Sequence, residues 1–259
     1  MRLLILFLIA LAVPAAGAER TLTVTDFDGV RVEGPFVVTV TTGRSTSGKL
    51  SGDLRALDHV RVDIEAGTAV IRATEDANDA KPAKVMLVTR TLARASLAGA
   101  GSLTVDRMGG LDTRISLDGA GSLTVGALAS DQLIAMAKGT GTQTLAGTAK
   151  TATIEARGSG VLDATRLTIA DAKITLDGSA TLTASASREA NIGAKGTGTA
   201  TVYGKAACTV KREGSVTVLC GKVAGLAPAA TPAPAFAALP RVQVGVPPAL
   251  RQMRRAVHP

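Results

Sequence analysis

A glycine-centred motif recurs seven times in the second half of the chain, and it constrains the fold more than any other feature. Each copy holds a turn glycine, in most copies followed by a second glycine and Ser or Thr, as in Ala98-Gly99-Ala100-Gly101-Ser102. The turn glycines are Gly99, Gly119, Gly139, Gly158, Gly178, Gly196 and Gly214, separated by 20, 20, 19, 20, 18 and 18 residues. So regular a period indicates stacked copies of one structural unit.

Apolar residues alternate with polar or small ones on both sides of each motif. Ile115, Ile154 and Ile174 stand at one equivalent position before the turn, and Leu103 and Leu123 at one after it. Steps of two are the period of a β-strand. The sequence therefore predicts an all-β fold, a parallel β-helix (β-solenoid) with coils of about 18–20 residues that stack at about 4.8 Å.

The composition agrees with a narrow stacked core. Hydrophobic residues make up 46% of the 259 residues, but aromatic residues make up only 2%. The inward positions are Ala, Val, Ile and Leu, with Thr and Gln as exceptions. The glycines fit turns that need positive φ or close backbone approach. A phosphate-binding loop is the competing interpretation, but the G-x-G-x-x-G spacing, the following helix and the acidic partner are missing.

The two cysteines, Cys208 and Cys220, stand six residues on either side of Gly214. Both fall at inward positions of the last coil, where Arg212 replaces an apolar residue. In an oxidising compartment this spacing predicts a disulfide that cross-links the two sides of the terminal coil. A redox-active pair is the alternative, although there is no C-x-x-C motif.

The remaining segments divide the chain further. Residues 19–92 are rich in strand patterns but irregular, and we expect them to form a capping start of one continuous solenoid, with Phe27 and Phe36 filling the cap. Asp26 and Asp28 hint at calcium, but two carboxylates alone favour a solvated turn, so no metal site is predicted. Residues 93–221 hold the repeats. Residues 222–259 are rich in Ala and Pro and are predicted to be disordered.

The first 18 residues have the pattern of a secretory signal peptide. Arg2 precedes an apolar run over residues 3–13, and Ala16-Gly17-Ala18 is an A-x-A cleavage site. The chain is therefore expected to be exported to the periplasm, the cell surface or the medium, with no transmembrane segment. Without Arg2 the chain has 28 basic and 21 acidic residues, a net charge of +7. No motif of interleaved aromatic and basic residues points to nucleic acid.

Catalytic residues are not evident. The position before the turn glycine carries mixed charges: Asp118, Lys138, Arg157, Asp177, Lys195 and Glu213. Asp118 and Asp177 are three coils apart, roughly 14 Å at about 4.8 Å per coil. Paired glycosidase carboxyls lie about 5–9.5 Å apart. His59 and His258 have no obvious partners, so no catalytic residue and no cofactor is predicted.

Three segments together resemble a known family. The first segment is Arg20-Thr-Leu-Thr-Val-Thr-Asp-Phe-Asp-Gly-Val-Arg-Val-Glu-Gly-Pro-Phe-Val-Val-Thr-Val. The second is Gly52-Asp53-Leu54 with Val60 to Ile71, and the third is the set of Gly-x-Gly-Ser copies. In this order they resemble the putative auto-transporter adhesin head domain, or head GIN domain, over about residues 20–221. The resemblance implies a right-handed β-helix in an exported bacterial protein. It supplies no catalytic residues. This chain lacks the lipid-bearing cysteine that some relatives carry.

The favoured function is an exported, non-enzymatic module of the cell envelope or medium that binds an unknown protein or glycan surface. Two alternatives stay open: a carbohydrate-active enzyme on a β-helix, and a structural envelope protein that self-associates through open coil ends. The sequence predicts no oligomeric state.

Overall fold

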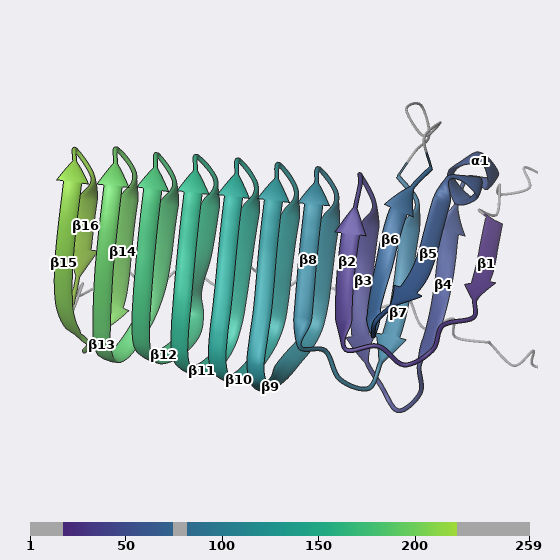
Figure 1. The fold of residues 1–259 in the computed structure, drawn as a ribbon, viewed down its shortest axis with the longest axis horizontal. Coiled ribbons are helices and arrows are strands. Elements are labelled where there is room, and N and C mark those ends of the chain that lie inside the picture. Colours follow the sequence, from purple (N-terminus) through teal and green to yellow (C-terminus); the bar gives the residue numbers. More distant parts are fainter. Residues whose placement is uncertain (1–17, 75–81, 222–259) are drawn as a thin grey trace, which may run out of the picture. The chain divides into compact units, whose positions relative to one another are not determined.

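The computed structural model describes residues 18–74 and 82–221 (Figure 1). The elements before the repeats are β1 (Ala18–Leu22), β2 (Gly29–Glu33), β3 (Val37–Thr42), β4 (Ser47–Gly52), α1 (Leu54–Asp58), β5 (Val60–Glu65), β6 (Thr68–Ala73) and β7 (Lys84–Thr89). The repeats contain β8 (Arg94–Gly99), β9 (Ser102–Gly119), β10 (Ser122–Gly139), β11 (Thr142–Gly158), β12 (Val161–Gly178), β13 (Thr181–Gly196), β14 (Thr199–Gly204), β15 (Ala207–Gly214) and β16 (Thr217–Cys220).

The repeats form a parallel β-solenoid of flattened coils, which confirms the predicted fold class. β10 pairs with β9 in parallel, and each residue lies beside the residue 20 positions earlier, from Ser122 beside Ser102 to Gly139 beside Gly119. Each long strand bends once, so its first residues belong to one layer and its last eight to the other (Figure 1). We call the layer that follows the glycine turn the first layer and the layer that precedes it the second layer.

Differences in coil length are absorbed at the bend opposite the glycine turn. Between β10 and β11 the offset is 20 residues at Ser122 and Thr142, and it becomes 19 after a register shift between Val125 and Leu128. A β-bulge accommodates such a missing or extra residue by local bending. The glycine turns therefore stay stacked even though the period varies.

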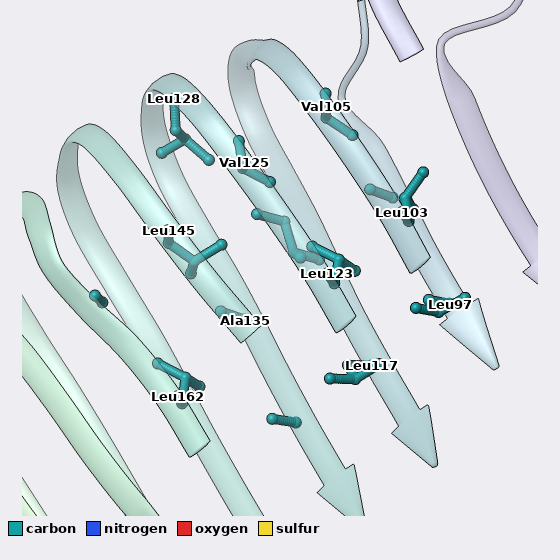
Figure 2. Packing of buried hydrophobic residues seen from close by; sticks show 14 of the residues in the cluster. Leu97, Leu103, Val105, Leu117, Leu123, Val125, Leu128, Ala135, Leu145 and Leu162 are labelled. Atoms are coloured by element: carbon teal, nitrogen blue, oxygen red, sulfur yellow. The ribbon is translucent and has the colours of Figure 1, made fainter. Parts of the chain in front are cut away.

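The core lies between the two layers and consists of stacked aliphatic residues. Leu103 and Leu123 of the first layer point inward, as does Leu117 of the second, and none is more than 2% exposed (Figure 2). Complete burial of such a side chain stabilises the fold by about 1.5–3 kcal/mol. Gln143 and Thr113 are buried in the same core, and the Gln143 amide has no hydrogen-bond partner among the described residues.

The N-terminal part has strands where they were expected, but its coils do not stack in chain order. β2 lies between β6 and β8 in the second layer, and β3 lies between β7 and β9 in the first. The earliest coil is therefore inserted between two later ones. Phe27 and Phe36 are buried, as expected, but they belong to this inserted coil and not to the end of the stack.

The N-terminal end of the stack is built from antiparallel strands and a short helix. β4 pairs antiparallel with β7, β1 pairs antiparallel with β4, and β5 pairs antiparallel with β6. Asp53 precedes α1, and its carboxylate accepts a hydrogen bond from the Arg55 amide. Antiparallel pairing ends the run of parallel coils at this side.

Two predicted segments lie outside the described residues: nearly all of the signal peptide (residues 1–17) and the Ala/Pro-rich tail (residues 222–259). In the part of the chain that the structure describes, no helix is both long and apolar enough to cross a membrane.

Candidate binding surface

The turn glycines serve the packing of the coils. All seven have positive φ, between 90° and 121°. A Cβ atom added to Gly139 would lie 2.5 Å from the carbonyl oxygen of Gly119 in the preceding coil. The amides of Thr140 and Gly141 donate hydrogen bonds to the same oxygen. The turn is thus filled by backbone from the neighbouring coil.

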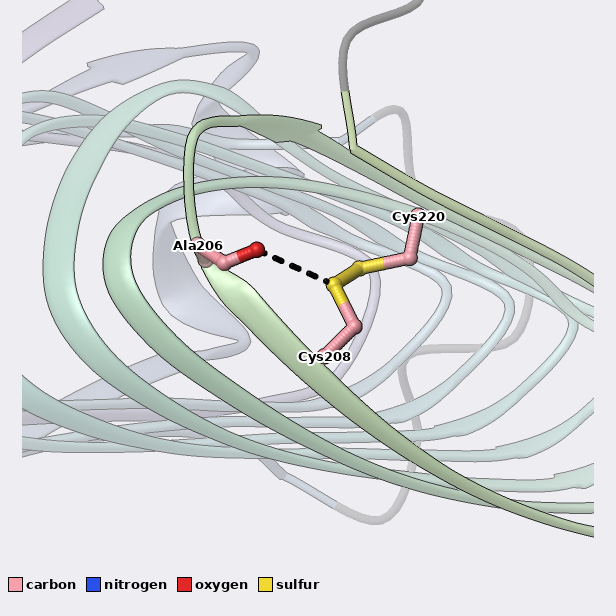
Figure 3. The surroundings of a disulfide bond; sticks show 3 residues. All are labelled: Ala206, Cys208 and Cys220. Carbon is pink, nitrogen blue, oxygen red and sulfur yellow. Dashed lines mark hydrogen bonds between the residues drawn. A yellow bond between two sulfur atoms is a disulfide. The ribbon is translucent and has the colours of Figure 1, made fainter.

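Cys208 and Cys220 face each other across the last coil and are bonded (Figure 3). Their Cα atoms are 6.4 Å apart, inside the range of about 4.4–6.8 Å that disulfides adopt. The Cys208 sulfur also contacts the Ala206 carbonyl oxygen at 3.4 Å. The bond joins β15 of the second layer to β16 of the first.

The charged residues before the turn glycines form a mixed ladder. The strand register places Lys138 and Arg157 between Asp118 and Asp177. The Nζ of Lys195 lies 3.7 Å from a carboxylate oxygen of Glu213. Two carboxylates separated by two cations do not form the close pair that glycoside hydrolysis uses.

The other candidate residues pair with close neighbours. The Asp26 carboxylate accepts hydrogen bonds from Thr46 and Arg90, which hold the pKa of that carboxyl below its usual value. Asp28 pairs with Arg94, and the Nδ1 of His59 lies 3.1 Å from the Thr74 hydroxyl. His258 lies outside the described residues. The described residues contain no group of three or more His, Cys, Asp or Glu side chains suited to a metal ion.

The outer side of the first layer carries two rows of hydroxyl groups. Neighbouring strands from β9 to β14 pair in register, so equivalent side chains stand beside each other at about 4.8 Å. We define the hydroxyl face by ten residues: Ser102, Ser122, Thr142, Thr181 and Thr199 in the first row, and Thr104, Thr124, Thr144, Thr183 and Thr201 in the second. Of these, Thr201 at the end of the second row is buried. Val161 and Asp163 interrupt the rows at β12.

A groove of about 540 Å³ runs along the first row beside the glycine turns. It crosses β9, β10 and β11, and one end is bounded by Pro35, Phe36 and Pro82. Its volume is within the range of about 300–1,000 Å³ typical of ligand sites. The groove follows the stacking direction, so a ligand in it would cross several coils.

Strand propensity alone does not explain the hydroxyl face. Threonine favours any exposed strand position, so propensity would distribute it over both layers. At the equivalent outward positions of the second layer the same coils carry a mixture of charged, apolar and hydroxyl residues, such as Arg114, Met136, Lys173, Thr153 and Thr175. The concentration of hydroxyls in one layer therefore calls for a cause specific to that layer.

Asp163 is the one charged residue within the two rows. Its Oδ1 accepts hydrogen bonds from the Thr165 amide at 3.0 Å, the Thr165 hydroxyl at 2.6 Å and the Thr183 hydroxyl at 2.9 Å. Desolvation raises the pKa of this carboxyl, but these hydrogen bonds and the positive charge of Arg166 together lower it by more, so the pKa lies below its usual value. Asp163 is therefore ionised at neutral pH and held in place.

Tyr203 continues the outward positions of β14 beyond Thr201 and lies beside Ser185 of β13. It is half-buried, and it is the only tyrosine of a chain that has no tryptophan.

The hydroxyl face was not among the sites predicted from the sequence. Its signal was nevertheless present, because Ser/Thr-x-Ser/Thr follows the second glycine position in most copies, as in Thr181-Leu182-Thr183.

The family model described as "Putative auto-transporter adhesin, head GIN domain" matches residues 26–206. The chain belongs to this family. The resemblance found in the sequence is thereby confirmed, and the family is adhesin-like.

Solved structures share the fold. A putative adhesin from Bacteroides fragilis aligns with a TM-score of 0.74 at 17% identity, covering 80% of this chain and 98% of that one. A putative lipid binding protein from Parabacteroides distasonis aligns with a TM-score of 0.64 at 17% identity, covering 81% and 98%. A putative adhesin from Parabacteroides merdae aligns with a TM-score of 0.61 at 18% identity, covering 80% and 96%. None of these names denotes an enzyme, and at such identities the likeness shows the fold alone. No curated protein matches the chain.

Proposed function

We propose that the chain is an exported, non-enzymatic binding module of the cell envelope or medium, and that the hydroxyl face is its contact surface. The signal-peptide pattern of residues 1–18 supports export. Membership of an adhesin-like family supports a binding role.

The observation that carries the proposal is the register of the hydroxyl face. Nine hydroxyls outside the buried Thr201 are presented by strands that are hydrogen-bonded on both sides, so the array is held rigidly before any partner arrives. A rigid array loses little conformational entropy on binding. Apart from Thr183, whose hydroxyl already donates to Asp163, a hydroxyl of the face can both donate and accept a hydrogen bond, and the groove beside the first row gives a partner a place to enter.

The charged residues support a non-enzymatic role. Asp118 and Asp177 are separated by two cations, and Asp26 and Asp28 are each engaged by an arginine. Asp26 and Asp28 are thus occupied by ion pairs, and Asp118 and Asp177 have cationic neighbours in the ladder. Individually, such exposed pairs contribute roughly 0–1 kcal/mol to stability.

Adhesion of the full chain to immobilised cell-envelope material tests the proposal. Thr124→Val together with Thr144→Val removes two hydroxyls from the second row while keeping the side-chain shape. Thr153→Val together with Thr175→Val makes the same change on the outer side of the second layer. We expect the first pair to weaken adhesion about ten-fold, which corresponds to roughly 1.4 kcal/mol, and the control pair to leave it unchanged. Equal adhesion of both variants and the wild type would overturn the choice of this face.

A further inference from the structure

We infer that the hydroxyl face binds a linear, uncharged polysaccharide that lies along the stacking direction, with Asp163 as the position that excludes acidic polymers. This inference rests on the proposed function and names the ligand class for the same surface. It follows from the periodicity, the charge and the shape of the face.

The periodicity of the face suits a polymer with a short repeat. Hydroxyls recur at each coil, about 4.8 Å apart, along a direction perpendicular to the strands. An extended polysaccharide advances by a similar distance per sugar ring and presents hydroxyls at each ring. One sugar can therefore meet one coil, and the same hydrogen bonds can be repeated several times along the groove.

The charge of the face argues against an acidic ligand, although the protein as a whole is basic. The outward positions of β9 to β14 that form the two rows hold no lysine or arginine, and Asp163 is their only ionised side chain. A like charge directly opposite a bound group weakens binding at an interface. An acidic polysaccharide would place carboxylates along the row in which Asp163 stands, whereas an uncharged one would not.

Asp163 also offers a directional contact to a sugar. Its Oδ1 is occupied by Thr165 and Thr183, while no hydrogen bond within residues 18–74 and 82–221 reaches Oδ2. A carboxylate is an acceptor for sugar hydroxyls, and charge-assisted hydrogen bonds are about twice as strong as neutral ones. Because the neighbouring threonines hold Oδ1, the carboxylate is fixed in the row, next to Thr144 of the adjacent coil in the strand register.

Tyr203 gives this surface its own spectroscopic reporter. It lies on β14, two strands along the stack from β12, which carries Asp163. With no tryptophan and no second tyrosine in the chain, the ultraviolet emission of the protein comes from this ring. A polymer that covers the face from β10 to β14 would change that emission.

The test is a titration of the full chain with three hexasaccharides, followed by calorimetry and by Tyr203 emission. The probes are a β-1,4-linked glucose hexamer, its N-acetylated amino-sugar counterpart and a galacturonic acid hexamer. We expect one or both neutral hexamers to bind with a change in emission, and the acidic hexamer to bind at least about ten-fold more weakly, a difference of roughly 1.4 kcal/mol. Asp163→Thr, which restores the residue type of the row, should reduce this discrimination against the acidic hexamer.

Two controls separate this inference from the proposed function. Thr124→Val with Thr144→Val should weaken binding of the neutral hexamers, whereas Thr153→Val with Thr175→Val should not. Tighter binding of the acidic hexamer, or binding that both pairs leave unchanged, would overturn the inference. A third result would separate the two proposals: no hexamer binds, and adhesion to envelope material persists after periodate has oxidised the sugars of that material. If adhesion then still depends on Thr124 and Thr144, the ligand class is wrong and the proposed face stands. If adhesion is the same in the wild type and in the variant with Thr124→Val and Thr144→Val, the proposed function fails as well.

Discussion

In the coils from β9 to β13 each strand lies beside the strand that precedes it and the one that follows it in the sequence, whereas β2 and β3 lie between strands that come later in the chain. Both regions form the same two layers around one aliphatic core. The repeats find their neighbours through self-similarity, because the next coil has the same glycine turn and the same inward columns. The N-terminal part has no such repeat, so its strand order depends on long-range pairing.

The glycine turns show the same contrast. In the repeats, the space beside the turn glycine is taken by backbone of the preceding coil, as at Gly139. At Gly34, the turn between β2 and β3, the nearest atoms belong to the Phe36 side chain, at 3.0 Å. A side chain can move away and a hydrogen-bonded backbone cannot, so the two turns should tolerate change differently.

The insertion of β3 predicts an all-or-none result in cysteine cross-linking. Thr39 lies beside Thr104 of β9 on one side and beside Met86 of β7 on the other. Thr39→Cys with Thr104→Cys should form a disulfide on mild oxidation, because adjacent strands are about 4.8 Å apart. Met86→Cys with Thr104→Cys should not, since two strand spacings, roughly 10 Å, exceed the reach of a disulfide. Mass spectrometry detects the bond, and the opposite pattern would place β7 beside β9.

The largest loss of stability is expected for Gly139→Ala. The added Cβ meets the Gly119 carbonyl oxygen and the residue keeps a φ of 101°, so we expect a loss of roughly 3 kcal/mol or more in the free energy of unfolding. Gly34→Ala should cost roughly 1–3 kcal/mol, from its positive φ alone. Gly193→Ala is the control: its nearest contact is 4.0 Å away, and alanine should be neutral or stabilising by up to about 1 kcal/mol. Urea unfolding ranks the three, and equal losses would contradict the backbone argument.

Loss of the disulfide should affect one end of the stack. The bond spans 12 residues, so Cys208→Ser with Cys220→Ser should cost roughly 3 kcal/mol. Because each coil contacts only its neighbours, the effect should stay near β14, β15 and β16. Hydrogen exchange should speed up there and remain unchanged in β9. Two reactive thiols in the denatured, unreduced protein would show that the bond does not form.

Gln143→Leu should stabilise the repeats. The amide is fully buried without a hydrogen-bond partner among the described residues, and its neighbours in the column are Leu123 and Leu162. An unpaired buried polar group costs roughly 1–3 kcal/mol, part of which leucine should recover. A lower melting temperature for this variant would indicate that the amide is satisfied in solution.

The smallest effect concerns Asp163 and pH. Its pKa in the folded protein lies below the ordinary value of 3.8, so its ionised form stabilises the fold above that value. This contribution is lost as the pH falls through the lowered pKa. Asp163→Asn should therefore be less stable than the wild type at pH 7, by less than about 1 kcal/mol for so exposed a group, and the difference should vanish in strong acid. A difference that grows in acid would contradict this sign.

The repeat allowed the fold to be predicted because each inward column recurs in every coil. The inward Leu103 and Ile115 columns and the turn at Gly139 were all foreseen from spacing alone. At the first copy, where the pattern begins, the alternation would place Ala93 inward, two residues before Ala95, but the buried residue is Leu92 and Ala93 is half-buried. The position of β2 in the sheet could not be foreseen, because its own residues do not indicate which later strands pair with it.

The hydroxyl face was overlooked for a different reason. Serine and threonine satisfy a polar outward position without further explanation, and only the two-layer arrangement shows that they form rows in one layer, unbroken except at β12, and occupy scattered positions in the other. Asp163 likewise looks like an ordinary surface carboxylate until the register places it in a row of threonines.

Nuclear magnetic resonance of threonine methyl groups tests the central claim most directly, because threonines occur on the outer sides of both layers. On addition of the β-1,4-linked glucose hexamer, the methyl signals of Thr104, Thr124, Thr144 and Thr183 should shift, while those of Thr153 and Thr175 should stay in place. Shifts confined to the second layer, or spread equally over both, would contradict the account.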